Sequence, residues 1–427
     1  MRAIVAVLLC LVPSLAVAEP ARRLTLQQAI DEAMRTSPSV SAARARSDAR
    51  RDAARALRGQ LLPRVGLADE QTRYRDPWNP TLLGETFHAR DVDTNVFTVS
   101  VEQPLLGLLS LTAEKSALDH TAEAALKTAR AAELDLREAV RLGFLALFEA
   151  RAIVSAAHTS VEQLLEQTRV TQSRLSAGVA LSGELLRVKV ALATARQQEI
   201  QAHANEQVAR ARLMEIVGRG PEDTSIDFEE PTEIEHEIEA PGPLEHLLDQ
   251  AFERRLDLQS ARLRSEAERS RARGRRLDLL PGLSVVGAYQ HIRGEVLAPA
   301  DASWLGIRVS WTAWDWGAKY YEGSGARHDA DAVQVEEELL RRKIATEVAE
   351  CAAELDAASS AVTLATEAIV SAEEAYRVTD VQVRAGTATV TDLLDAQSAL
   401  TQVRLNLVRA RYARAMASVL LAHATGA

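Results

Sequence analysis

The sequence repeats itself, and this repeat limits the possible folds more than any other feature. The triplet Leu61–Pro63 recurs as Leu279–Pro281, 218 residues later. Val99 and Val309 match at a shorter spacing of 210 residues, which places an insertion of about eight residues in the first copy, between Pro63 and Val99. A repeated unit often cannot bury its apolar face alone. With only two units in the chain, we expect that other chains complete the fold.

The first eighteen residues, 1–18, have the features of a secretory signal peptide. A positive Arg2 precedes a short apolar run, and Ala16-Val17-Ala18 supplies the small residues that favour cleavage after Ala18. The mature chain then keeps Cys351 alone, which cannot form an internal disulfide and, in an alanine-rich helix, is better interpreted as a packed side chain than as a reactive thiol. No later run of about 18 apolar residues predicts a membrane-spanning helix. The destination is therefore the periplasm, the medium or an outer-membrane β-barrel.

The mature chain divides into a first repeat (19–218), an acidic linker broken by glycine and proline (219–243), and a second repeat (244–427). Each repeat opens with two short helices, and Thr25 with Gln28 predicts a capping box at the first of them. Pro63 and Pro281 push the preceding residue out of the α region. These two prolines therefore mark predicted helix-to-strand transitions.

Residues that alternate between apolar and polar predict a β-hairpin in each repeat, at about 64–103 and 282–313. Such period-two patterning over about ten residues is typical of a barrel strand with one face toward lipid and one toward a water-filled lumen. Four strands are too few to close a barrel around a pore. Four of the five tryptophans cluster near the last strand, as expected for barrel interface aromatics at a membrane surface or for packing between barrel and helices: Trp304, Trp311, Trp314 and Trp316.

Two very long helices are predicted at about 108–176 and 318–385. In the second, large residues recur every seven positions and small residues follow three positions later, which indicates closely packed, supercoiled helices. The large residues are Val348, Leu355, Val362, Ile369, Tyr376 and Val383. A helix of this size is on the order of 100 Å long. Gly178 and Gly386 interrupt the pattern and predict helix-hairpin turns, each followed by a returning helix of about 35 residues.

Composition excludes several classes of function. The formal net charge is −10, and both signs are interleaved along the helices, so no nucleic-acid partner is expected. No glycine-rich phosphate loop, HExxH motif or ordered Ser/His/Asp set is present. The nine histidines are scattered and only four methionines occur, so we expect neither a metal site nor a cofactor. An enzyme is not expected, since uniform helical seams leave no evident pocket.

The order of signal, helices, Leu-Leu-Pro, hairpin, long helix, glycine turn and return helix, present twice, resembles the TolC-type outer-membrane efflux protein family. The most specific segment is 385–397, Ala-Gly-Thr-Ala-Thr-Val-Thr-Asp-Leu-Leu-Asp-Ala-Gln, which is similar to the family signature at the periplasmic tip, and 177–185 is its weaker counterpart. The resemblance implies a mainly α fold with a β-barrel portion. In it, a homotrimer closes a 12-strand outer-membrane barrel in lipid, continued by a 12-helix periplasmic tunnel.

The resemblance also implies where the narrow periplasmic entrance lies. The family's acidic constriction residues match Asp392 and Asp395, with Glu184 in the first copy. Asp392 and Asp395 are three residues apart and share a helix face, and a threefold axis would turn them into a ring of carboxylates that attracts cations. Asp392 is also well placed simply to cap the returning helix. A Tyr and an Arg that help to latch the entrance in the family are replaced by Val383 and Ala388.

The preferred function is a passive exit duct of a tripartite efflux or type I secretion system. It would dock to a periplasmic adaptor protein and an inner-membrane efflux transporter. The alternative is a soluble periplasmic coiled-coil scaffold or adaptor, which explains the heptads and the signal but not the duplicated hairpins or the tryptophan-rich strand. We expect the choice of exported substrate, whether drug, metal or polypeptide, to lie mainly with these partners.

Overall fold

The computed structural model describes residues 22–230 and 240–427, so the predicted signal peptide and residues 231–239 of the predicted linker lie outside the described residues. The helices are α1 Leu26–Thr36, α2 Pro38–Gln60, α3 Gly107–Ser176, α4 Ser182–Ile216, α5 Leu244–Arg254, α6 Leu256–Leu277, α7 Ala318–Ala385 and α8 Val390–Ala424. The strands are β1 Arg22–Leu24, β2 Arg64–Arg73, β3 Thr81–Leu82, β4 Glu85–Thr86, β5 Arg90–Pro104, β6 Ile226–Phe228, β7 Gly282–Glu295 and β8 Asp301–Ser310.

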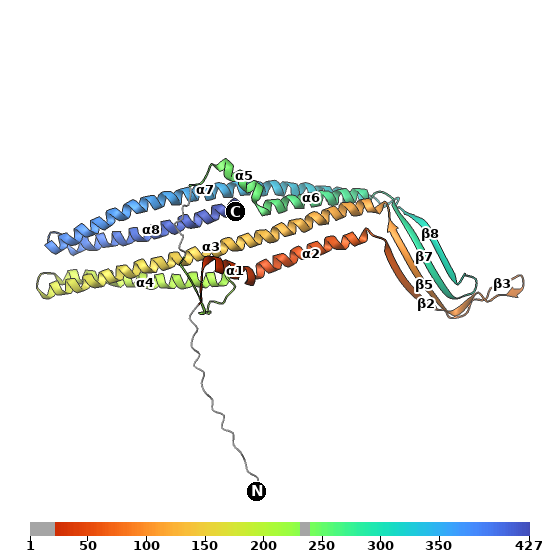
Figure 1. Cartoon of the computed structure of the whole chain (residues 1–427), viewed down its shortest axis with the longest axis horizontal. Helices are drawn as coiled ribbons and strands as arrows, with labels where there is room; N and C mark the ends of the chain where they lie inside the picture. Colours follow the sequence, from red (N-terminus) through yellow and green to blue (C-terminus); the bar gives the residue numbers. More distant parts are fainter. Residues whose placement is uncertain (1–21, 231–239) are drawn as a thin grey trace, which may run out of the picture. The chain divides into compact units, whose positions relative to one another are not determined.

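The element order passes twice through the same series (Figure 1). Helices α1 and α2, the strands β2 and β5, and helices α3 and α4 recur as α5 and α6, β7 and β8, and α7 and α8. The predicted mainly α fold with duplicated hairpins is confirmed. Thr25 and Gln28 form the expected reciprocal capping box at α1. The extra residues of the first copy lie between β2 and β5, where they include the small pair β3 and β4.

The two predicted hairpins form one antiparallel sheet with the order β2-β5-β7-β8. Strands β5 and β7 join the two repeats at its centre, with Val99 opposite Tyr289. Strands β2 and β8, each ten residues long, are the edge strands, and each has a single partner in this sheet. Both edges therefore present backbone donors and acceptors that can pair with another chain.

One face of the sheet carries a band of apolar side chains, and the other combines polar residues with buried apolar ones such as Val286 and Ala288. Paired residues lie on the same face, so the register places apolar side chains of β2, β5, β7 and β8 together, and most of them are exposed: Val65, Leu67, Val99, Val101, Val285, Tyr289, Leu305, Ile307 and Val309. The opposite face carries Ser100, Glu102 and Arg308, and an ion pair joins the last two at 3.5 Å. An exposed apolar face of this size is not expected to remain in water.

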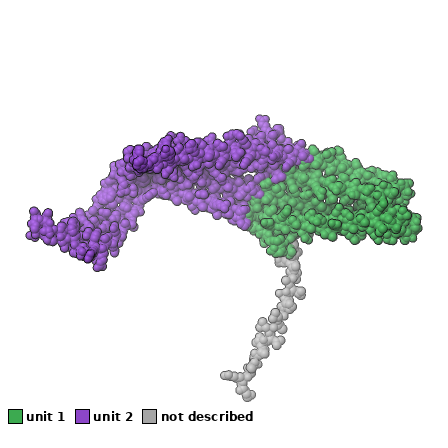
Figure 2. All heavy atoms as spheres, turned by 180° about the vertical axis from the view of Figure 1, so that it is seen from behind, with its two compact units in different colours: residues 1–37, 136–239, 358–419 green, residues 38–135, 240–357, 420–427 purple. Residues whose placement is uncertain are grey.

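The chain divides into two compact units, shown in different colours in Figure 2. Of the described residues, unit 1 comprises 22–37, 136–230 and 358–419, and unit 2 comprises 38–135, 240–357 and 420–427. Each unit takes residues from both repeats. Unit 1 therefore contains both hairpin turns at Gly178 and Gly386, and unit 2 contains the whole four-stranded sheet.

Unit 1 has its largest apolar core where α1, α3, α4 and the parallel pair of β1 and β6 meet. Phe144 of α3 packs edge-on against Phe228 of β6, with ring centres 5.9 Å apart. Arg151 lies beside this core and donates to Asp227 at 2.6 Å and to the carbonyl oxygen of Phe228 at 3.0 Å. The described part of the linker is therefore attached to the long helix α3 by an ion pair and to the first repeat by strand pairing.

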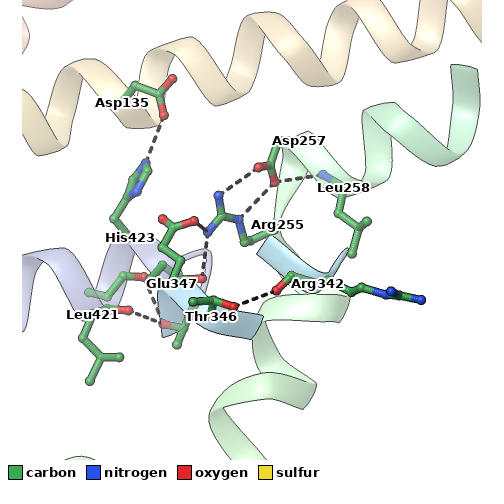
Figure 3. A network of polar contacts seen from close by, with 12 residues as sticks. Asp135, Arg255, Asp257, Leu258, Arg342, Thr346, Glu347, Leu421 and His423 are labelled. Carbon is green, nitrogen blue, oxygen red and sulfur yellow. Dashed lines mark hydrogen bonds and ion pairs between the residues drawn. The ribbon is translucent and has the colours of Figure 1, made fainter. Parts of the chain in front are cut away.

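In unit 2, Arg255, the residue between α5 and α6, joins the start of α6 to the middle of α7 and the end of α8 (Figure 3). Its guanidinium donates to Asp257 at 2.8 Å, to Glu347 of α7 at 2.8 Å and to the carbonyl oxygen of Ala424 in α8 at 3.4 Å. Arg255 is nearly buried, so these charge-assisted bonds also satisfy a group that would be costly to leave unpaired.

The heptad pattern of α7 is reproduced by its burial. The large residues of the predicted seam are buried or half-buried, and most positions between them are exposed. Leu355 is buried, and Ala358, three residues on, is half-buried. This is the behaviour of a helix that packs along one narrow stripe.

Candidate functional site

The candidate site is the end of unit 1 where the two helix hairpins turn. Gly386 follows α7 with φ +79°, and Gly178 follows α3 with φ +75°. Both values lie in the left-handed region, which glycine adopts without steric cost. In each turn an amide after the glycine returns to the helix: Val179 donates to the carbonyl of Arg174, and Thr387 to that of Gln382, both at 2.9 Å. The glycines therefore end the outgoing helices and let the chain reverse.

Asp392 caps the first turn of α8. Its carboxylate accepts bonds from the backbone N–H of Thr389 at 2.8 Å and from the Thr389 hydroxyl at 2.7 Å, and the Asp392 amide donates back to that hydroxyl at 3.2 Å. This is a reciprocal capping box. The bonds from Thr389 favour the charged carboxylate and hold the pKa of Asp392 below its ordinary value. The capping role considered for Asp392 is therefore present within a single chain.

Asp395 and Glu184 lie in the same tip region as Asp392. Asp395 is exposed one helical turn after Asp392, and Glu184 is half-buried in the first turn of α4. No two of these three side chains bond to each other among the described residues.

Two arginines that the sequence analysis did not single out join the hairpins within unit 1. Arg187 of α4 donates to the hydroxyl of Thr391 in α8 at 2.6 Å, and Arg174 of α3 donates to the backbone carbonyl of Val383 in α7 at 3.3 Å. A comparison of the two repeats could have identified Arg187. Arg187 matches Asp395 at the spacing of 208 residues that also relates Gly178 to Gly386. The first copy thus places a cation where the second copy has an acid.

Val383, which replaces a tyrosine of the family, is a core residue here. It packs in a buried cluster with Val188 of α4 and with Val390 and Leu393 of α8, and Ala388 packs at the edge of this cluster. The two hairpins of unit 1 are therefore held together by apolar contact as well as by the arginines. These contacts join the tips without the tyrosine and arginine of the family.

The helix-to-strand transitions fall at the two prolines. Helix α2 ends shortly before Pro63, and strand β2 begins directly after it. Helix α6 ends shortly before Pro281, and strand β7 begins directly after that proline. Each proline thus stands immediately before a strand, where its missing N–H removes no hydrogen bond from the sheet.

The four tryptophans do not lie on one surface of the sheet. Trp304 belongs to β8 but points to the face opposite Leu305, whereas Trp311, Trp314 and Trp316 follow β8 in the connection to α7. Trp314 and Trp316 contact each other edge-on at 5.8 Å and are strongly exposed. The interface role therefore stays a prediction for all four tryptophans, with Trp304 on the face opposite Leu305.

The described residues, 22–230 and 240–427, contain no helix apolar enough over its length to cross a membrane. In the same ranges, no group of three or more His, Cys, Asp or Glu side chains is arranged to hold a metal ion. The site thus consists of helix caps, exposed carboxylates and packing contacts.

Comparison with known proteins identifies a family. The model of the outer membrane efflux protein family matches residues 29–219 and 247–427, one match for each repeat. Outer membrane protein TolC of Escherichia coli (strain K12) is 22% identical over 411 residues, which cover 91% of this chain and 79% of that protein.

Solved structures show the same fold. The outer-membrane channel OprN superimposes with a TM-score of 0.82 at 20% identity, and the match covers 94% of this chain and 89% of OprN. The outer membrane protein VceC of Vibrio cholerae superimposes with a TM-score of 0.81 at 19% identity, with 94% and 96% covered. These findings do not favour a soluble periplasmic scaffold. The chain belongs to the outer membrane efflux protein family and is an outer-membrane channel-tunnel of that type.

Proposed function

We propose that three copies of the chain close one barrel in the outer membrane and one helical tunnel in the periplasm, and that this assembly is the exit duct of a tripartite efflux or type I secretion system. A periplasmic adaptor and an inner-membrane transporter would deliver the substrate to the tip of unit 1. The similar protein OprN is an outer-membrane channel, in agreement with a conduit rather than a catalyst.

The observation that carries this proposal is the sheet with two open edges and an apolar face. Four strands cannot enclose a pore, and β2 and β8 match in length at ten residues each. Leu305 of β8 is 80% exposed and Leu67 of β2 is 72% exposed on the same face. Pairing of β8 with β2 of the next copy would satisfy both edges and turn this face toward lipid.

Cysteine pairs across the expected seam test the assembly. Val65→Cys in β2 and Ile307→Cys in β8, two positions on the apolar face, should together give disulfide-linked dimers and trimers in detergent. A matched control combines Val65→Cys with Val101→Cys, because Val101 lies directly opposite Val65 in the same chain, and it should give only links within one chain. A mature protein that stays soluble and monodisperse without detergent, with no links between chains, would overturn the proposal.

The acidic tip is proposed as the periplasmic entrance constriction. Asp392, Asp395 and Glu184 lie at the end of unit 1, and threefold assembly would bring three copies of each carboxylate together. Like charges at close range attract cations. Capping by Asp392 is compatible with this role, because one carboxylate oxygen accepts both capping bonds and the residue is exposed.

Conductance in planar bilayers tests the constriction. Asp392→Asn with Asp395→Asn removes the charges and retains the shape of each side chain, so block by multivalent cations should weaken. Glu367→Gln, an exposed acid about five helical turns before the tip of α7, is the matched control and should leave block unchanged. Equal block in the double variant and in the unaltered protein would place the constriction elsewhere.

A further inference from the structure

An arm projects beyond the sheet between β2 and β5 (Figure 1). It contains β3 and β4, which pair through Thr81 opposite Thr86 and Leu82 opposite Glu85. Its base is joined by a backbone bridge between Trp78 and Arg90. The second repeat has only a short turn, residues 296–300, at the matching position. The arm is therefore an addition of the first repeat.

The arm has a polar face and a largely apolar face, because successive side chains of a strand point to opposite sides. On the polar face, the hydroxyls of Thr81 and Thr86 lie 3.1 Å apart. On the other face, Leu82 is 65% exposed and Phe87 is 48% exposed, and Glu85 lies between them in sequence. The two threonine hydroxyls share a hydrogen bond, whereas Leu82 and Phe87 each leave about half or more of the side chain exposed.

The tip of the arm is strained. Leu83 and Gly84 form the two-residue turn between β3 and β4, with φ of +56° and +89°. This turn type suits glycine or asparagine at both positions, and a leucine in the left-handed region is unfavourable. Leu83 is also 98% exposed. A strained, exposed leucine at the end of the arm suggests a contact that the single chain does not contain.

Lipid chains are a poor partner for this face. Toward the arm, the apolar face of the sheet becomes polar in two successive rows of paired residues. The first row surrounds Phe97 with Asp69, His291 and Asp301, and the second consists of Gln71, Asn95 and Arg293. The His291 ring and the Asp301 carboxylate lie 2.8 Å apart. These polar rows lie between the apolar band and the arm, so the hydrocarbon region ends before the arm begins.

A second copy of the chain supplies a matching surface. The turn between β7 and β8 exposes Val296 and Leu297, although the Val296 amide already donates to the carbonyl of Ala89 at the base of the arm in the same chain. The arm leaves edge strand β2, and in the proposed trimer β2 adjoins β8 of the neighbouring copy. Each arm would then lie between its own turn and the turn of its neighbour.

We infer that Leu82 and Phe87 pack on the Val296–Leu297 turn of the neighbouring copy, so that three arms clasp the trimer at the end of the barrel remote from the helices. This inference rests on the proposed trimer. It assigns a role to the extra residues of the first repeat and to the exposed turn of the second. The contact would remove apolar area of both surfaces from water, which favours association.

Disulfide trapping tests the clasp in the detergent-purified full chain. Leu82→Cys combined with Leu297→Cys should give linked dimers and trimers on oxidation. Thr81→Cys combined with Leu297→Cys is the matched control, because Thr81 is the neighbouring residue on the polar face, and it should give little linkage. As a second readout, Leu82→Asn with Phe87→Asn should lower the temperature at which the trimer dissociates, whereas Thr81→Ser should not.

The outcomes separate the clasp from the assembly. Trimers that form the seam link between positions 65 and 307, but no link between positions 82 and 297 of different copies, would overturn the clasp alone. A link between 82 and 297 only within one chain would overturn it in the same way. Quenching by brominated lipid of a fluorophore attached to the Leu82→Cys variant would place the arm in the bilayer and also reject the clasp. Loss of both links with no trimer would overturn the proposed function.

Discussion

The two hairpin turns of unit 1 come from matching positions of the repeats but are stabilised differently. The turn at Gly386 leads into a helix with a complete capping box, formed by Thr389 and Asp392. The turn at Gly178 leads into α4, whose cap position is occupied by Leu181 without a side-chain bond. The first tip instead supplies Arg187, which bonds to the second tip.

This difference indicates that the two repeats have different roles at the tip. The second tip is stabilised locally and presents acids, whereas the first tip has the weaker helix start and reaches across to its partner hairpin. In an assembly of six identical single-repeat chains, every tip would have to perform both tasks. Duplication within the chain lets one copy change without the other. The following predictions test this contrast.

The largest effect is expected from the apolar cluster that both tips share. Leu393→Ala removes a side chain that is 1% exposed and packs against Val188 of the first hairpin. Truncation of a buried leucine costs about 2–5 kcal/mol. Hydrogen exchange should therefore become faster at both turns, around Gly178 and Gly386, although only the second hairpin is altered.

Leu186→Ala is the matched control for this prediction. Leu186 lies on α4 near the same tip but is 61% exposed, so its truncation should change stability by no more than about 0.5 kcal/mol. Faster exchange confined to the second hairpin in Leu393→Ala would show that the tips do not share a core. The two hairpins would then be stabilised independently of each other.

A smaller effect is expected from the arginine of the first tip. Arg187→Ala removes the bond to Thr391, worth about 1 kcal/mol, and should loosen α8 and increase single-channel conductance. Arg187→Lys keeps a donor and should recover part of the effect. Lys189→Ala, an exposed cation two residues away, should change nothing. Unchanged conductance in Arg187→Ala would show that the bond from Arg187 to Thr391 stabilises the tip without affecting the channel.

Much of this architecture could be predicted because it depends on local pattern. The seven-residue spacing from Val348 to Val383 predicted the packed stripe along the second half of α7, and alternation at Leu305, Ile307 and Val309 identified β8. Proline and glycine marked the ends of helices for a steric reason that needs no partner. These features follow from the sterics of the backbone and from the spacing of apolar residues along each helix or strand.

Other features could not be predicted, because they depend on how elements are rotated against each other. The bond from Arg187 to Thr391 requires the relative orientation of α4 and α8, which the seam pattern does not specify. The arm was expected only as an insertion in a loop. Its turn has Leu83 where glycine or asparagine usually signals a hairpin, so no local turn signal was present.

An exchange of caps should make the two tips more alike. Leu181 already has the extended backbone of a cap residue, and Glu184 occupies the third helical position, so Leu181→Thr would complete a capping box at the first tip. The first turn of α4 should gain about 1 kcal/mol. Thr389→Ala should weaken the first turn of α8 in return. Hydrogen exchange of each turn measures both changes, and no slowing in α4 would mean that the tip lacks a cap for another reason.

The smallest expected effect is a dependence on pH that only the second tip should show. The pKa of Asp392 is lowered by its bonds from Thr389, so the folded chain binds a proton there less readily than the unfolded chain does. This stabilisation is complete above the ordinary aspartate pKa of about 3.9 and is lost as the pH falls through the lower folded-state pKa. Exchange in the first turn of α8, corrected for intrinsic rates, should therefore quicken as the pH falls below about 4, and Asp392→Asn should remove the dependence. The first turn of α4 serves as the internal reference. If it quickens equally, the acid effect arises outside the capping box, and the contrast between the tips does not extend to their charge.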